Sequence, residues 1–394
     1  MITRRITNMT PSATIELEGT VAELEAAGVH VIGLNAGEPD FNTPQNVVEA
    51  CYTAMKEGKT KYVSVTGIMP LRQAICEKLK SDNGVDYKPN QIVVSTGAKQ
   101  ALYNAILTIC SPGDEVIIPA PCWVSYVEMV KLADAVPVLV GTGPDYALDV
   151  EAVAKAVTPK TRAVIINTPN NPTGAVYSKE ALLALGELAV KRDFHVISDE
   201  VYEKLVYDGC KHYCLASFSD AIKAHSIIVN GFSKAYAMTG WRVGYTASSP
   251  EIARGIASLQ GHTTSNSTTF VQWAALEALR GPQGTIEAMR QEFDKRRVYL
   301  LGRLRAMEGI TCANASGAFY LMPDVSAYFG KRDGDRVIKN SADFCAYLLD
   351  KAHLAVVPGS AFEAPATVRI AYSNSLDNIK AGMDSMERAL ARLR

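Results

Sequence analysis

Short apolar runs alternate with segments of helical periodicity along the first two thirds of the chain. Six of these runs are four or five residues long and rich in valine and isoleucine, as is typical of buried β-strands. They cover residues 91–95, 115–119, 136–140, 163–167, 194–198 and 226–229. Amphipathic segments before and between them predict helices, for example at 44–58 and 71–82. Repeated strand-then-helix units predict an α/β fold, in which helices flank a mostly parallel sheet.

The pattern changes near the C-terminus. A long helical run over 284–307 leads into a mixed β/α pattern in 308–394. A chain of 394 residues is long for one compact core, so we expect two domains. We expect a large domain at 46–290 and a smaller α+β domain at 291–394. Residues 1–45 are expected to form an N-terminal arm and part of the smaller domain.

The first residues indicate an extended arm that leads into a helix. Residues 1–15 contain basic and polar residues but lack the apolar core of a secretory signal. A helix is predicted over 15–27, and either Ser12 or Thr14 is placed to cap it.

The charge balance argues against two classes of partner. The chain has 40 basic and 41 acidic side chains, so nothing predicts binding to nucleic acid or to an anionic membrane. No run of 18 apolar residues occurs, so no transmembrane helix is expected.

The eight cysteines are scattered and form no CxxC pair. Cys210 and Cys214 bracket His212, but a structural zinc site needs a fourth ligand, and none lies nearby in the sequence. We therefore expect no metal, and we interpret the chain as a cytoplasmic protein with free thiols.

The segment 230–244 carries the candidate chemistry. Its lysine, Lys234, lies just past a predicted strand end. A buried lysine amine can bond to an aldehyde, because desolvation frees its nucleophilic form. Ser233 and Arg242 suit a phosphate group. Pyridoxal phosphate is a cofactor that carries both an aldehyde and a phosphate. The plainer interpretation of the segment is a strand followed by a surface lysine and a glycine-rich turn.

Further motifs strengthen the first interpretation. Four further motifs follow one another along the chain: Gly37-Glu-Pro-Asp-Phe41, Asn170-Asn-Pro-Thr-Gly174, Ser198-Asp-Glu-Val-Tyr202 and Val368-Arg-Ile-Ala-Tyr-Ser373. With Ser233-Lys-Ala-Tyr-Ala-Met-Thr-Gly-Trp-Arg242, the chain resembles the class I, fold-type I pyridoxal-phosphate-dependent aminotransferases, and in particular the bacterial aspartate aminotransferase subgroup. The resemblance covers essentially the whole chain and implies a seven-stranded sheet in the large, cofactor-binding domain.

The resemblance implies roles for the residues around the cofactor ring. Lys234 would bond to the cofactor aldehyde and later move the substrate proton as base and acid. Asp199 would pair with the ring nitrogen. Tyr202 and Asn171 would hydrogen-bond the phenolic oxygen, and Trp123 would stack on the ring. Asp199 alone could equally be a helix cap, and Trp123 alone a core residue.

The resemblance also implies a phosphate site and a dimer. The helix start at Gly97, Ala98 and Lys99 would hold the phosphate together with Ser233 and Arg242. Tyr62 would reach the phosphate of the neighbouring subunit, which implies a homodimer with shared active sites. A surface aromatic in a loop is the alternative for Tyr62.

Substrate binding is assigned in the same way. Arg369 would clamp the substrate α-carboxylate, with help from Asn171 and the Gly37 backbone. The other residues assigned to the substrate are Trp123, Lys99, which favours a second carboxylate, and Thr14.

The expected reaction is amino transfer between L-aspartate and 2-oxoglutarate. Aromatic donors remain open, and Thr10 argues against prephenate because relatives that use it carry Lys or Arg at this point. A C–S β-lyase that shares Lys234 and Asp199 is one alternative class. A cofactor-sensing regulator module is another, but residues 1–45 are too short for a DNA-binding domain.

Overall fold

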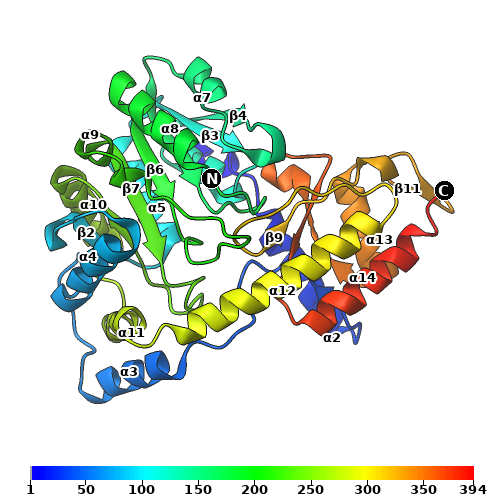
Figure 1. Cartoon of the computed structure of the whole chain (residues 1–394), viewed down its shortest axis with the longest axis horizontal. Coiled ribbons are helices and arrows are strands. Elements are labelled where there is room, and N and C mark those ends of the chain that lie inside the picture. The colour runs from blue at the N-terminus through cyan, green and yellow to red at the C-terminus, as the bar shows by residue number, and fades with distance from the viewer. Residues whose placement is uncertain (1) are drawn as a thin grey trace.

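A seven-stranded sheet forms the centre of the larger lobe (Figure 1). The computed structural model describes residues 2–394. The strand order is β2-β8-β7-β6-β5-β3-β4, and every strand is parallel to the rest except β8, which is antiparallel to β2 and β7. The mostly parallel sheet is therefore confirmed. The strands are β2 (Ile92–Ser95), β3 (Glu115–Ala120), β4 (Val136–Gly141), β5 (Thr161–Asn167), β6 (His195–Asp199), β7 (Ser226–Gly231) and β8 (Gly244–Ala247).

Strand β8 is the one strand of this sheet that the apolar pattern missed. Its four residues, Gly-Tyr-Thr-Ala, carry neither a run of β-branched residues nor a clear alternation. All four are nevertheless buried, because β2 and β7 pair with them on both sides. Tertiary pairing overrides weak local propensity here.

Both faces of the sheet are covered. In β5, Ile165 packs into the cluster on one face, whereas Val164 and Ile166 pack into the cluster on the other. This alternation follows from the two-residue period of a strand. Burial on both sides explains why the strands read as continuous apolar runs.

The helices of the two faces come from different parts of the chain. One face carries α5 (Ala98–Ile109), α6 (Val124–Leu132) and α10 (Pro250–Thr263). The opposite face carries α7 (Val150–Ala156), α8 (Lys179–Arg192) and α9 (Asp220–Ala224). A third apolar cluster joins the sheet edge at β2 and β8 to α3 (Gln45–Lys56), α4 (Met69–Asn83) and α11 (Thr269–Arg280).

The long helix α12 (Gly284–Ala306) leads from the larger lobe to the smaller one, where α13 (Ser341–Ala352) and α14 (Leu376–Leu390) lie (Figure 1). The smaller lobe contains an antiparallel sheet in the order β13-β14-β9. The N-terminal segment joins this lobe, because β1 pairs in parallel with β12. The strands are β1 (Ile32–Gly33), β9 (Tyr320–Leu321), β10 (Arg332–Asp333), β11 (Arg336–Val337), β12 (Leu354–Ala355), β13 (Val357–Pro358) and β14 (Val368–Ala371).

The N-terminal arm differs from the prediction. It is helical in part, since α1 (Arg4–Thr7) and the start of α2 (Ala13–Ala26) fall inside the expected extended segment. Ser12 occupies the cap position of α2, but its side chain accepts no backbone hydrogen bond and instead lies 2.9 Å from the hydroxyl of Thr14. Neither hydroxyl caps the helix, so that prediction is wrong. Among the described residues, no helix has both the length and the apolar composition of a membrane span.

Candidate active site

A cavity of about 600 Å³ opens where strands of the large sheet end and the smaller lobe begins. Its lining combines the start of α5, the start of α6, the ends of β5 and β6, the segment after β7, and β14. Ligands of α/β sheets bind at this edge, beyond the carboxyl ends of the parallel strands. Its charged side chains are Lys99, Lys234, Arg242, Arg369, Glu18, Glu38 and Asp199.

Lys234 lies three residues beyond the end of β7 and points into this cavity. Its ammonium donates to the backbone carbonyl of Gly37. Burial lowers the pKa of Lys234 to about 8, Arg369 and Arg242 act in the same direction, and Glu38 opposes them. A substantial fraction of the amine is therefore neutral, and hence nucleophilic, near physiological pH.

Asp199 is the last residue of β6 and is buried. Its carboxylate accepts a hydrogen bond of 2.6 Å from the hydroxyl of Tyr126 and one of 3.3 Å from the backbone N–H of Val201. Burial raises the pKa of Asp199 to about 6, although these hydrogen bonds oppose the rise. The side chain is thus an ionised, buried carboxylate at pH 7 whose hydrogen-bond donors are neutral, which suits a cationic N–H of a ligand.

Two tyrosines meet beside the lysine. The hydroxyls of Tyr202 and Tyr320 lie 2.9 Å apart, and the Lys234 ammonium lies 5.8 Å from the ring centre of Tyr202. Burial raises the pKa of Tyr202 well above its usual range, so this phenol stays protonated and can donate to a ligand oxygen.

Trp123 stands at the N-terminus of α6, half-buried at the cavity wall. Its ring packs edge-to-face on Tyr126, with ring centres 5.4 Å apart. The Lys99 ammonium lies 4.8 Å from the centre of the Trp123 ring. Burial lowers the pKa of Lys99, and Arg242 lowers it further. Because two cations face each other here, an anion in this part of the cavity would be stabilised.

The start of α5 forms a cradle for an anion. The first N–H groups of a helix have no acceptor inside the helix and carry its positive dipole end. Gly97 precedes this turn with a φ of +83°, and a Cβ there would lie 2.6 Å from Nη2 of Arg242. Glycine at this position therefore lets the guanidinium approach the helix start. Ser233 contributes a hydroxyl to the same cavity.

Arg369 lies on β14 and is 2% exposed. It donates to Oδ1 of Asn171 at 3.0 Å and to the carbonyl of Asn35 at 2.7 Å, while its Nε has no partner among the described residues. Among residues 2–394, no carboxylate forms an ion pair with Arg369, and Glu18 is the one acidic side chain that acts on its pKa, as the weakest cause. A buried guanidinium with a free donor and no counter-ion favours a ligand carboxylate.

These groups fit pyridoxal phosphate. A carboxylate, a lysine amine and an anion cradle with a guanidinium line one cavity and match the cofactor's ring nitrogen, aldehyde and phosphate. The amide oxygen of Asn171 already accepts from Arg369, which leaves its N–H groups for the ligand's phenolic oxygen.

Most of the residues predicted from sequence come together at this cavity. Those that line it are Thr14, Gly37, Ala98, Lys99, Trp123, Asn171, Asp199, Tyr202, Ser233, Lys234, Arg242 and Arg369. Gly97 directly precedes Ala98 in the chain, and its lack of a side chain leaves room for Arg242 at the start of α5. Tyr62 does not line the cavity, and its side chain is 89% exposed.

Sequence reasoning missed two tyrosines of the site. Tyr126 donates to Asp199, and Tyr320 meets Tyr202 and stacks against the Arg369 guanidinium, whose carbon is 4.6 Å from the ring centre. Tyr126 follows Trp123 by three residues at a helix start, so helical spacing could have indicated it. Tyr320 carries no comparable signal, because its place depends on the packing of the smaller lobe.

Comparison with known proteins identifies the family. The family model for aminotransferase class I and II matches residues 29–385. The chain is 45% identical over 390 residues to an aspartate aminotransferase of Bacillus sp. (strain YM-2), with 98% of both chains covered. It is 45% identical over 393 residues to a probable aspartate/prephenate aminotransferase of Aquifex aeolicus (strain VF5), covering 99% of this chain and 98% of the relative. The solved structure of Thermus thermophilus aspartate aminotransferase with maleate matches with a TM-score of 0.93 and 41% identity, covering 99% of each chain.

The chain therefore belongs to the aminotransferase class I and II family. The α/β fold and the enzyme class expected from the sequence are confirmed. Within the family, the chain matches aspartate aminotransferases over nearly the full length of both chains. The expected resemblance to the aspartate-type subgroup is therefore confirmed as well.

Proposed function

We propose that this aminotransferase uses pyridoxal 5′-phosphate to transfer the amino group of L-aspartate to 2-oxoglutarate in a ping-pong reaction. The observation that carries the proposal is the combination of a buried lysine of lowered pKa, a buried carboxylate and an arginine without a counter-ion around one cavity. When bound, the cofactor supplies an aldehyde for the amino group and an aromatic ring that withdraws electrons from the substrate's Cα.

The protein's own side chains would then do four things. Lys234 would hold the cofactor and carry the Cα proton as base and acid. Asp199 would keep the ring nitrogen protonated, with Tyr126 fixing the orientation of its carboxylate. Tyr202 and Asn171 would donate to the phenolic oxygen. Arg369 would bind the substrate α-carboxylate through its free Nε–H and the planar, bidentate geometry of its guanidinium.

The phosphate and ring would be held by the start of α5 and its neighbours. Gly97, Ala98 and Lys99 would present the helix N-terminus, and Ser233 and Arg242 would add a hydroxyl and a guanidinium. Trp123 would pack on the ring from the start of α6.

A dicarboxylate substrate is supported by charge. Lys99 and Arg242 bring a second positive region to the same cavity as Arg369. The Thermus relative was solved with maleate, which is a dicarboxylate. Thr14 and the Gly37 backbone lie at the cavity wall, where they would contact the bound amino acid.

Prephenate is the second candidate substrate, because the Aquifex relative is a probable aspartate/prephenate aminotransferase. Thr10, in place of a basic residue, argues against it. A C–S β-lyase would release pyruvate from cystathionine without any keto-acid acceptor, so this assay separates the lyase from the transaminase.

A homodimer with shared sites is part of the proposal. Tyr62 is 89% exposed, and further apolar side chains are exposed on α3 and at the start of α4, namely Val48, Tyr52, Met55 and Met69. Such a surface suits a subunit interface. Tyr62 would enter the partner's cavity and bind its phosphate. We further propose the domain division 1–45, 46–290 and 291–394, and a reducing, cytoplasmic location that suits eight free cysteines.

The direct test begins with the apoprotein. Pyridoxal phosphate is added, the complex is reduced with borohydride, and peptides are analysed by mass spectrometry. We expect one reduced adduct, on Lys234. A panel of amino donors, followed by half-reaction spectra, then identifies the substrate, with aspartate and glutamate expected to react fastest. An unmodified Lys234 would overturn the cofactor assignment.

A further inference from the structure

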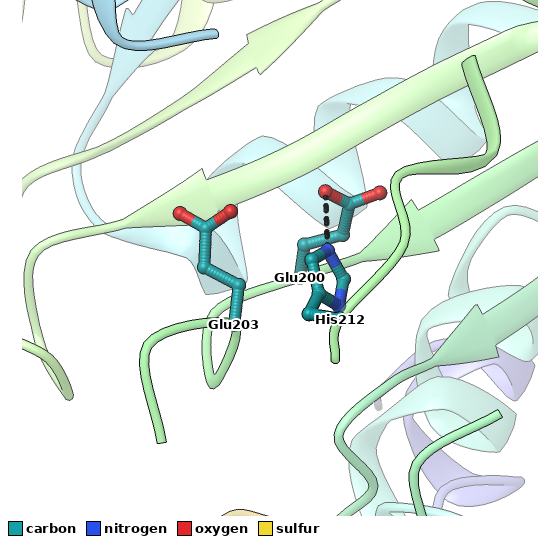
Figure 2. Close-up of side chains that lie close together, drawn as sticks. All are labelled: Glu200, Glu203 and His212. Carbon is teal, nitrogen blue, oxygen red and sulfur yellow. Dashed lines mark hydrogen bonds and ion pairs between the residues drawn. The ribbon is translucent and has the colours of Figure 1, made fainter. Parts of the chain in front are cut away.

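The turn after β6 sends two more carboxylates into a second buried cluster, away from the cavity lining. Figure 2 shows Glu200 and Glu203 on this turn, with the ring of His212 against the Glu200 carboxylate. One ligand-capable atom from each of the three lies within 4.8 Å of the others. Glu200 is fully buried, and the side chains of Glu203 and His212 are 8% and 7% exposed.

Glu200 has defined partners on both oxygens. The hydroxyl of Ser198 donates to one oxygen at 2.9 Å, and Nε2 of His212 donates to the other at 3.2 Å. Nδ1 of His212 has no partner among residues 2–394, so Glu200 is the one hydrogen-bonding partner of this ring. The strength of the contact therefore depends on whether the ring is charged.

Glu203 ties three elements together. Its carboxylate forms an ion pair with Lys78 of α4. It also accepts hydrogen bonds of 2.9 Å from the amides of Asn83, at the end of α4, and Asn230, in β7. Asn230 lies four residues before Lys234, so the turn that carries Asp199 and Tyr202 is joined to the segment that carries the lysine.

The net charge of the cluster distinguishes a protonated His212 from a bound metal ion. Lys78 neutralises one of the two carboxylates, and one negative charge remains. A protonated His212 balances that charge, whereas a divalent metal ion would leave the cluster positive and would face the Lys78 ammonium. The charged groups that act on His212 are Lys78, Glu200 and Glu203. Three further titratable groups act on the two carboxylates, namely Tyr87, Cys214 and Tyr245.

Protonation states support this balance. Burial by itself lowers the pKa of His212, but the two carboxylates outweigh it and raise the pKa above the usual value. Burial likewise opposes ionisation of Glu203, yet Lys78 and His212 hold its pKa at about 2. Glu200 is adjacent to Asp199 in the chain, and its negative charge raises the pKa of Asp199.

We propose that Glu200, Glu203, Lys78 and His212 form a charge-balanced network that positions the Asp199–Tyr202 turn, and that protonated His212 shields Asp199 from the charge of Glu200. The inference rests on the proposed pairing of Asp199 with the cofactor's ring nitrogen. His212 is a positioning residue, since it acts through Glu200 and touches neither cofactor nor substrate.

A charge-compensation experiment tests the network. The variants are His212→Gln, Glu200→Gln and the double variant, and the measurement is the dissociation constant of pyridoxal phosphate from titration of each apoprotein. His212→Gln leaves the Glu200 charge unbalanced, and we expect the dissociation constant to rise about tenfold at pH 6.5. The double variant restores the balance and should return to within about threefold of the wild type.

The pH dependence gives an independent readout. The wild-type ring is charged below its raised pKa and loses its charge as the pH rises through that value. His212→Gln should therefore differ most from the wild type at pH 6.5, and the difference should shrink at pH 9. A purely steric role of the ring predicts the same difference at both pH values.

The matched control is His225→Gln. His225 pairs with Asp193 at 3.3 Å just before the start of β6. The variant therefore removes a histidine–carboxylate contact at the end of this strand opposite to Asp199. Its dissociation constant should stay within about twofold of the wild type.

The outcomes separate the hypotheses. The network is overturned if His212→Gln binds the cofactor as His225→Gln does at both pH values, or if the double variant binds as weakly as His212→Gln. If His212→Gln does not fold, the double variant decides alone, since folding with near-native affinity supports the network and failure to fold overturns it. If the wild type itself binds no pyridoxal phosphate, the proposed function fails, and a double-mutant cycle on the unfolding midpoints of the apoproteins judges the network.

Discussion

The turn after β6 faces two buried regions that differ in how their charges are balanced. On the cavity side, Asp199 has neutral hydrogen-bond donors and Arg369 has no counter-ion within the described residues. On the other side, Glu203 pairs with Lys78 and Glu200 pairs with His212. Asp199 lies one residue before Glu200 and four before Glu203, yet only the second region pairs its charges internally.

The difference distinguishes a binding site from a structural cluster. Burying an unpaired charge is costly, so a protein retains one where a ligand supplies the partner. Paired buried charges cost less and fix the geometry of the chain around them. The balanced cluster thus fixes the turn, whereas the cavity keeps buried charges that a ligand of complementary charge can pair.

Removal of Lys234 tests the cavity side most severely. In the proposed function, Lys234 both holds the cofactor and carries the substrate proton. Lys234→Ala deletes this amine, so kcat for amino transfer should fall by at least about 10⁴-fold. Steady-state assays with aspartate and 2-oxoglutarate measure the loss. Lys160→Ala, which removes an exposed lysine, should leave kcat unchanged. Retention of even a tenth of the activity by Lys234→Ala would contradict the assigned role.

Arg369→Ala removes the unpaired guanidinium. Truncating one partner of a buried charge pair costs about 2–5 kcal/mol, which predicts a roughly 30- to 5000-fold loss of kcat/KM for aspartate. Arg369→Lys keeps the charge but not the fork, and should recover only part of the loss. Equal kinetics in the two variants would show that geometry is unimportant here.

Asp199→Asn probes the cost of the unpaired carboxylate. Burial raises the pKa of Asp199 in the folded protein from 3.8 to about 6. The protonated carboxyl is therefore tolerated below pH 3.8, and the unfolding free energy falls as the pH rises through 6 and the buried group ionises. Asparagine cannot ionise, and the apoprotein should gain about 3 kcal/mol of unfolding free energy at pH 8, and little or nothing at pH 4.

Urea unfolding at the two pH values measures this difference. Transaminase activity should fall in the same variant, because the neutral amide no longer holds a ring nitrogen in its protonated form. A variant less stable than the wild type at pH 8 would mean that Asp199 carries no unpaired charge in the apoprotein.

Lys99→Ala is expected to have the smallest effect and the most selective one. If Lys99 contacts the distal carboxylate, KM for aspartate should rise about tenfold while KM for alanine changes little. Both values come from half-reaction titrations followed by absorbance. Equal changes for the two amino acids would remove Lys99 from substrate selection.

Local patterns predicted the sheet well where both faces are buried. The six runs rich in valine and isoleucine are all strands of the large sheet, within one or two residues at their ends. Strand β8 and the start of α2 were not predicted. Strand β8 forms because neighbouring strands pair with it, and α2 has no buried residue that would give it an apolar face.

The same contrast holds for the site. Lys234, Asp199, Asn171, Arg242 and Arg369 could be named from their motifs, since chemical identity and spacing are both written in the chain. Tyr320 could not, because a tyrosine in an apolar segment gives the same sequence pattern whether it packs in a core or meets the hydroxyl of Tyr202.

The linear sequence determined the order of strands and helices, the reactive groups and the family to which they belong, because these follow from residue type and short-range periodicity. The balance of charge was decided only by the tertiary structure. Whether Glu203 meets Lys78, or Arg369 stays without an anion, depends on distances between segments far apart in the chain, and a buried charge has no fixed cost until its neighbours are in place.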